Sequence, residues 1–152
     1  MDATGLAPWG SAWMWSVPII MVTVIIHAFG LGLADARVVK VLKNNRKRRL
    51  PQRLSVAIMG GTAVFAVILH GFETSVWASA YVLLGAVEGR RSAMLYSVSA
   101  MTTYGHSDIH LGAKWQMMGA LEALNGWILF GLTTAFLFTI MQKVWPHMDH
   151  PD

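Results

Sequence analysis

The sequence has no cysteine and few charged residues, and both absences narrow the class of protein. Without cysteine there is no disulfide, no thiolate zinc site and no cysteine nucleophile. Charged residues make up 13% of the 152 residues, whereas a soluble domain usually contains about 25%. Hydrophobic residues make up 55%, and the mean hydropathy is +0.47. The composition therefore predicts an integral membrane protein, and we expect an all-α fold.

The few charges are unevenly distributed, which favours a membrane over a nucleic acid as partner. The formal net charge is +4, but eight of the twelve Lys and Arg residues lie between Arg37 and Arg53. A basic cluster between two apolar segments is typical of a cytoplasmic loop. Clustered Lys and Arg residues beside a membrane helix also attract anionic lipid head groups. The candidate lipid-binding residues are Arg46, Lys47, Arg48 and Arg49.

Three apolar segments are each long enough to cross a membrane core of about 30 Å at about 1.5 Å per residue. They are Trp13–Leu33, Ser55–Leu84 and Trp115–Val144. Basic residues follow the first segment rather than precede it, so we expect a retained helix and not a cleaved signal peptide. With the basic loop in the cytoplasm, we expect the N-terminus outside the cell (inner) membrane and the C-terminus in the cytoplasm.

The chain between the second and third spans is too short to cross the membrane. Ser92–Met101 is moderately apolar but only about ten residues long, and a polar loop at 102–114 follows it. We expect residues 92–111 to enter the membrane from the outer side and to leave on the same side. Irregular backbone at that depth is tolerated only where it is buried in protein or lines water. The sequence therefore predicts that neighbouring copies cover this segment.

The order of a short helix, Thr-Thr, a Gly-containing turn, Asp and a membrane helix resembles the pore module of the potassium-channel superfamily. Residues 102–108 read Thr-Thr-Tyr-Gly-His-Ser-Asp and align without a gap with the family signature Thr-Thr-Val-Gly-Tyr-Gly-Asp. The resemblance implies a homotetramer with a four-fold pore, in which each subunit contributes an outer helix, a pore helix, a filter loop and an inner helix. The expected parts of the chain are a peripheral helix at 1–36, a basic loop at 37–54, the pore module at 55–144 and a cytoplasmic tail at 145–152.

The resemblance also implies which residues form the selectivity filter. They are Thr102, Thr103, Tyr104, Gly105, His106, Ser107 and Asp108. In such a filter, backbone carbonyls replace the water shell of the ion, here the carbonyls of Thr103, Tyr104 and Gly105 around K⁺ or Na⁺. Ser107 stands where the family has glycine, and a left-handed serine costs about 1–2 kcal/mol. We therefore expect potassium permeation with reduced selectivity.

Two side chains of this loop have further expected roles. Four copies of Asp108 would form an acidic ring that concentrates cations at the outer mouth. His106 has two interpretations: its imidazole titrates near neutral pH and alters the mouth, or it packs behind the loop. His110 is expected to be an exposed loop residue.

Ionisable residues within the spans are functional candidates because they are costly in a membrane. His70, Glu73 and Glu122 are expected at one level of the outer leaflet, where they brace the filter, sense protons or bind a metal. His27 is expected about 9 Å from the inner end of its helix, too deep to join them. The sequence leaves the three roles open.

Gly126 and Gly131 lie in the third segment, which the resemblance makes the pore-lining helix. Each is either a hinge or a site of close helix packing. No span contains regularly spaced arginines, so voltage sensing by a charged helix is not supported. No catalytic residues are evident and no cofactor is expected beyond permeating monovalent cations. The sequence favours a passive cation channel. The alternatives are a non-conducting accessory or scaffold protein with the pore fold, and a proton- or metal-handling membrane protein that uses His70, Glu73 and Glu122.

Overall fold

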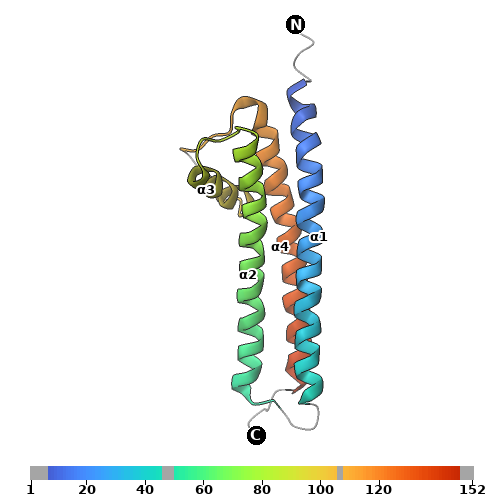
Figure 1. The fold of residues 1–152 in the computed structure, drawn as a ribbon. Helices are drawn as coiled ribbons and strands as arrows, with labels where there is room; N and C mark the ends of the chain where they lie inside the picture. Colours follow the sequence, from blue (N-terminus) through green and yellow to red (C-terminus); the bar gives the residue numbers. More distant parts are fainter. Residues whose placement is uncertain (1–6, 46–49, 106–107, 148–152) are drawn as a thin grey trace.

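The structure is a computed structural model that describes residues 7–45, 50–105 and 108–147. Every regular element in these ranges is a helix, and three of them are long and apolar enough to cross a membrane. This confirms the prediction of an all-helical protein with three candidate membrane spans. The elements are α1 (Ala7–Asn44), α2 (Gln52–Leu83), α3 (Arg90–Met101), the short 3₁₀ helix η2 (Ala113–Trp115), α4 (Gln116–Val144) and the 3₁₀ helix η3 (Trp145–His147) (Figure 1).

Helix α1 is longer than the apolar segment that predicts it. It continues beyond Leu33 to Asn44 and so includes the first part of the predicted basic loop. The reason is local, since residues 37–44 contain neither Gly nor Pro and their Lys, Arg and Leu residues favour helix. The 38 residues of α1 extend about 57 Å, more than a membrane core of about 30 Å. Residues 46–49 lie outside the described residues, so lipid binding there stays a prediction.

Helices α1 and α4 run parallel, and α2 runs antiparallel to both (Figure 1). Two side-chain contacts define how α1 and α4 are aligned. The Asn125 amide donates to the Thr23 hydroxyl at 2.9 Å, and Lys143 pairs with Asp35 at 2.5 Å. The residue numbers of the two helices therefore rise together from one end of the bundle to the other.

The short helix α3 lies beside α2 and α4, near the end of the bundle where α2 ends and α4 begins (Figure 1). The turn that leads into it has positive φ at Gly85 (62°) and Gly89 (81°), a conformation that glycine adopts without steric cost. At its other end, Met101 contacts Thr74 of α2 and Gly126 of α4. Gly126 is ten residues into α4, so α3 ends about 15 Å along that helix.

Candidate functional site

The loop after α3 folds back on the end of that helix. The backbone N–H of Thr103 donates to the Ala100 carbonyl at 3.0 Å, and the N–H of Tyr104 donates to the Ser99 carbonyl at 2.9 Å. No described residue donates a hydrogen bond to the carbonyl oxygens of Thr103, Tyr104 or Gly105. The amides of residues 102–105 are therefore satisfied within the chain, while the three successive carbonyls of residues 103–105 are available to water or a cation.

The backbone of the same loop alternates in handedness. Thr103 (φ 56°) and Gly105 (φ 77°) are left-handed, whereas Tyr104 between them is not. Thr103 is the only described non-glycine residue with positive φ, and this conformation costs a β-branched residue about 1–2 kcal/mol or more. Backbone strain of this kind is concentrated at functional sites. The Tyr104 side chain is 86% exposed, so this chain alone does not cover the loop.

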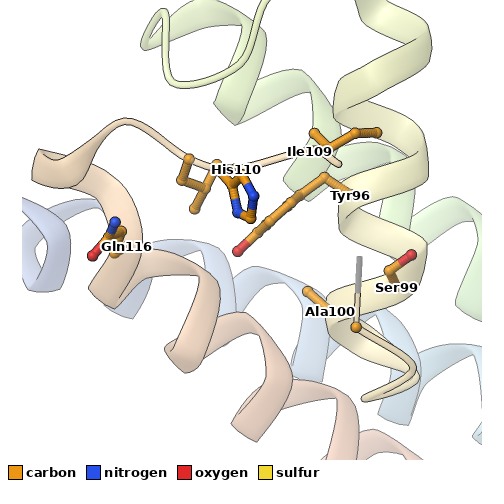
Figure 2. A pocket seen from close by; sticks show the side chains of 8 residues that line it. Tyr96, Ser99, Ala100, Ile109, His110 and Gln116 are labelled. Atoms are coloured by element: carbon orange, nitrogen blue, oxygen red, sulfur yellow. The ribbon is translucent and has the colours of Figure 1, made fainter. Parts of the chain in front are cut away.

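The remaining loop residues are placed in part. His106 and Ser107 lie outside the described residues, so their expected roles stay predictions. Asp108 is exposed, which leaves its carboxylate accessible to ions. His110 is also exposed, as expected. A pocket of about 270 Å³ separates the end of α3 from the returning chain; Figure 2 shows Tyr96 and Ser99 on its α3 side and His110 and Gln116 opposite.

Glu122 of α4 joins α3 and α2 through buried hydrogen bonds. The Tyr81 hydroxyl donates to Glu122 Oε2 at 2.6 Å, and the Ser97 hydroxyl contacts Oε1. The Ser97 hydroxyl oxygen also lies 2.9 Å from the backbone carbonyl oxygen of Thr74. Glu122, Tyr81 and Ser97 have no exposed surface. Because buried hydrogen-bonded polar groups define a unique packing, this network fixes the position of α3 between the two long helices.

Glycines of α4 allow α3 to pack directly against it. A Cβ atom at Gly126 would lie 2.2 Å from the Met101 carbonyl oxygen, and one at Gly119 would lie 2.0 Å from the Tyr96 hydroxyl. At Gly131 a Cβ atom would meet open space. Gly126 is therefore a site of close packing, and a hinge at either Gly126 or Gly131 stays a prediction.

A second polar cluster joins α1, α2 and α4. His27 Nδ1 lies 2.8 Å from Glu73 Oε1, and His70 Nδ1 lies 3.4 Å from Glu73 Oε2. The opposite ring nitrogens, His27 Nε2 and His70 Nε2, each lie 3.0 Å from the Thr133 hydroxyl. We call His27, His70, Glu73 and Thr133 the histidine cluster.

The histidine cluster corrects the expectation that His27 lies too deep to join the others. That depth was counted from Leu33 as the inner end of the helix, whereas α1 continues to Asn44. Counted from Asn44, His27 is about 25 Å from the helix end, and His70 is about 27 Å from the start of α2 at Gln52. The two histidines therefore lie at the same level of the bundle.

The structure also divides the predicted set of His70, Glu73 and Glu122. His70 and Glu73 belong to the histidine cluster, whereas Glu122 bonds to Tyr81 and Ser97. Sequence reasoning missed Tyr81, Ser97 and Thr133 as partners. Hydroxyl groups in apolar segments form no distinctive pattern, and only the packing of the helices brings them to the carboxylates.

An open cavity of about 650 Å³ connects the histidine cluster with the start of the loop after α3. It extends from His70 on α2 to Thr102 and Thr103 at the end of α3, and Trp127 and Phe130 of α4 line its other side. The cavity therefore places the exposed edge of the histidine cluster and the start of the loop on one surface.

Comparisons of the chain with models of protein families, with curated proteins and with solved structures find no match.

Proposed function

We propose that this protein is a subunit of a four-fold cation channel that conducts potassium with reduced selectivity. In this proposal the carbonyls of Thr103, Tyr104 and Gly105 from four copies bind the permeating ion, as the resemblance to potassium-channel pore modules implies. One observation supports the proposal most strongly: residues 103–105 have satisfied amides, alternating backbone handedness and three successive carbonyls without a donor among the described residues. Stacked rings of such carbonyls are the ligands that a cation filter uses.

The depth of α3 supports a pore. The 29 residues of α4 extend about 44 Å. If α4 crosses a core of about 30 Å centrally, a loop that starts about 15 Å along it lies about 8 Å inside that core. Exposed backbone at that depth must be covered by protein or water. Large apolar side chains around the open cavity, including Trp127 (70% exposed) and Phe130 (68%), are also uncovered in one chain. Neighbouring copies around a common axis would cover the loop backbone and these apolar side chains, and would leave a central path for water and ions.

The direction of α3 favours a cation at the end of that path. Its C-terminal end, at Met101, directly precedes the loop. The C-terminus of a helix carries a partial negative charge equivalent to about half an electron. The last turn of α3 contains no basic residue that would cancel it. Four copies of α3 aimed at one axis would therefore attract a cation, and Asp108 would do the same at the outer mouth.

The proposed location is the cell (inner) membrane, with the basic loop in the cytoplasm. This orientation places the start of α1 outside and the end of α4 inside. It also places α3 and the loop on the outer side, where Asp108 meets ions before the filter does. Permeating monovalent cations are the only ligands that the proposal requires.

Potassium flux into liposomes that contain the purified full-length protein tests the proposal. We expect flux from the unaltered protein, and loss of flux or of the preference for K⁺ over Na⁺ after Gly105→Ala. Alanine at φ 77° is strained by about 1–2 kcal/mol in each of four subunits. Gly112→Ala is the matched control because Gly112 is in the same segment, has φ −51° and has open space around its Cβ position.

Three outcomes are distinguishable. Flux in the unaltered protein and in Gly112→Ala but not in Gly105→Ala supports the filter at residues 103–105. Equal flux and selectivity in all three proteins would mean that the filter is elsewhere. Absence of flux from a protein that is tetrameric in detergent would favour the non-conducting accessory protein and would end the channel proposal.

A further inference from the structure

The histidine cluster offers the ligands of a metal site within the membrane bundle. His27, His70 and Glu73 each place one donor atom so that all three lie within 4.8 Å of one another. Among the described residues they are the one group of histidine and carboxylate side chains with this spacing. The ligands come from α1 and α2, and Thr133 of α4 contacts both imidazoles from the other side.

The burial of Glu73 favours a cationic partner. The residue has no exposed surface, and its Oε2 accepts no hydrogen bond in the described part of the chain. Its ion-pair partners there are His27 and His70, and neither Lys nor Arg contacts it. A buried carboxylate without a compensating charge is strongly unfavourable. A metal ion between the carboxylate and the two Nδ1 atoms would compensate the charge and use the free oxygen.

We propose that His27, His70 and Glu73 bind one divalent transition-metal ion of the zinc class. Two histidines and one glutamate form a ligand set that zinc uses with a fourth position left to water. Imidazole also suits Cu²⁺, Ni²⁺ and Co²⁺, whereas Mg²⁺ and Ca²⁺ prefer oxygen ligands. With ligand distances of about 2.0–2.2 Å, tetrahedral donor atoms lie about 3.3 Å apart. The longest separation, up to 4.8 Å, must therefore shorten by about 1.5 Å or less.

Thr133 provides the supporting shell for this site. Both histidines present Nδ1 to Glu73 and Nε2 to the Thr133 hydroxyl. When the two Nδ1 atoms bind a metal, both Nε2 atoms carry hydrogen and become donors. A hydroxyl oxygen has two lone pairs and can accept from both. A metal-bound histidine usually donates its second N–H to such an acceptor, which fixes the orientation of the ring.

An ion can reach the site through the open cavity of about 650 Å³ that His70 lines. The His70 side chain is 28% exposed, whereas His27 and Glu73 are fully buried. His70 therefore forms the accessible edge of the site. Metal binding would join α1 to α2 through His70, which lines the same cavity as Thr102 and Thr103 at the start of the loop.

The test is a titration of the full-length protein in detergent, without an affinity tag, with Co²⁺ alone and then with Zn²⁺ alone. The background variant replaces the four other histidines by Gln, because they can bind metal adventitiously. These are His106, His110, His147 and His150. We expect one ion per chain in this background, with the visible absorption of four-coordinate Co²⁺ that Zn²⁺ then abolishes.

Substitutions in the cluster identify the ligands. Glu73→Gln and His70→Gln should each abolish stoichiometric binding, and Thr133→Val should weaken it by about 10- to 100-fold. Glu122→Gln is the matched control, since Glu122 is an equally buried carboxylate outside the cluster. If Glu73→Gln does not elute as a folded helical protein, the result with His70→Gln tests the proposal. His70 is partly exposed, so its substitution perturbs folding less.

Binding that disappears in the background variant, or that survives both Glu73→Gln and His70→Gln, would overturn the proposal. No metal binding, together with a pH dependence of unfolding that Glu73→Gln removes, would mean that the cluster holds only a proton, and the metal proposal fails. The titration needs no ion flux, so its result is independent of whether the protein is a channel.

Discussion

The close approach of α3 to α4 at Gly126 leads to a prediction whose size follows from the structure. In Gly126→Ala the new Cβ would lie 2.2 Å from the Met101 carbonyl oxygen and 2.9 Å from the Met101 Cα, where ordinary contacts begin at 3.4 Å. The overlapping atoms are backbone, so a change of side-chain rotamer cannot relieve the overlap. The end of α3 must instead move by about 1 Å, and overpacking of this kind costs about 1–3 kcal/mol.

Gly131→Ala is the matched comparison for this variant. It lies in the same helix with open space around its Cβ position. Both substitutions gain the same helix propensity, at most about 1 kcal/mol, so the difference between the two variants isolates the overpacking. We expect Gly126→Ala to unfold at a lower temperature in detergent than Gly131→Ala. For a chain of this size, each kcal/mol corresponds to about 2–4 °C.

The same displacement affects the loop, because Met101 directly precedes Thr102. In liposomes, Gly126→Ala should therefore reduce the preference for K⁺ over Na⁺, whereas Gly131→Ala should retain it. Two variants with equal unfolding temperatures and equal selectivity would refute the reasoning, because α3 would then not pack on α4 at this glycine.

Three further predictions concern the polar contacts. Glu122→Leu removes the acceptor of the buried Tyr81 hydroxyl and should destabilise the protein by about 1–3 kcal/mol. Glu122→Gln keeps an acceptor and should lower the unfolding temperature much less. Equal losses of stability in the two variants would contradict the hydrogen-bond assignment. Asp35→Asn removes the partly exposed pair with Lys143, so the loss of stability should be below about 1 kcal/mol and should vanish at high salt. Replacing the basic residues at 46–49 by Gln should weaken binding to vesicles of anionic lipid by about 1 kcal/mol per residue. Co-flotation with anionic vesicles, compared with neutral vesicles, measures this binding. Unchanged binding would exclude this loop as the lipid site.

The sequence is sufficient to predict the three long helices, because each apolar run matches a membrane span. It places α2 and α4 to within a few residues at either end, since Pro51 and the glycines after Leu84 interrupt helix formation. It does not predict the end of α1, because Arg and Lys residues after an apolar run indicate a loop by charge and a helix by propensity. The wrong helix end then placed His27 too deep.

Contacts between helices are the part of the site that the sequence does not specify. Glu122 and Glu73 are recognisable as costly intramembrane carboxylates, but their partners are hydroxyls and histidines as many as 46 residues away in the chain. Which carboxylate meets which partner depends on helix rotation and alignment. Close packing at Gly126 becomes distinguishable from open space at Gly131 only after α3 is placed.

Recordings of ion current through single proteins in planar bilayers are the most direct test of the proposed channel. We expect discrete current steps whose reversal potential moves with the K⁺ gradient, approaching about 59 mV per tenfold gradient for perfect selectivity and less if Na⁺ also passes. Gly105→Ala should abolish the steps or remove the K⁺ preference, and Gly112→Ala should preserve both. Protein that inserts as a tetramer but produces no current steps at any pH or voltage would contradict the proposal that this protein is a channel.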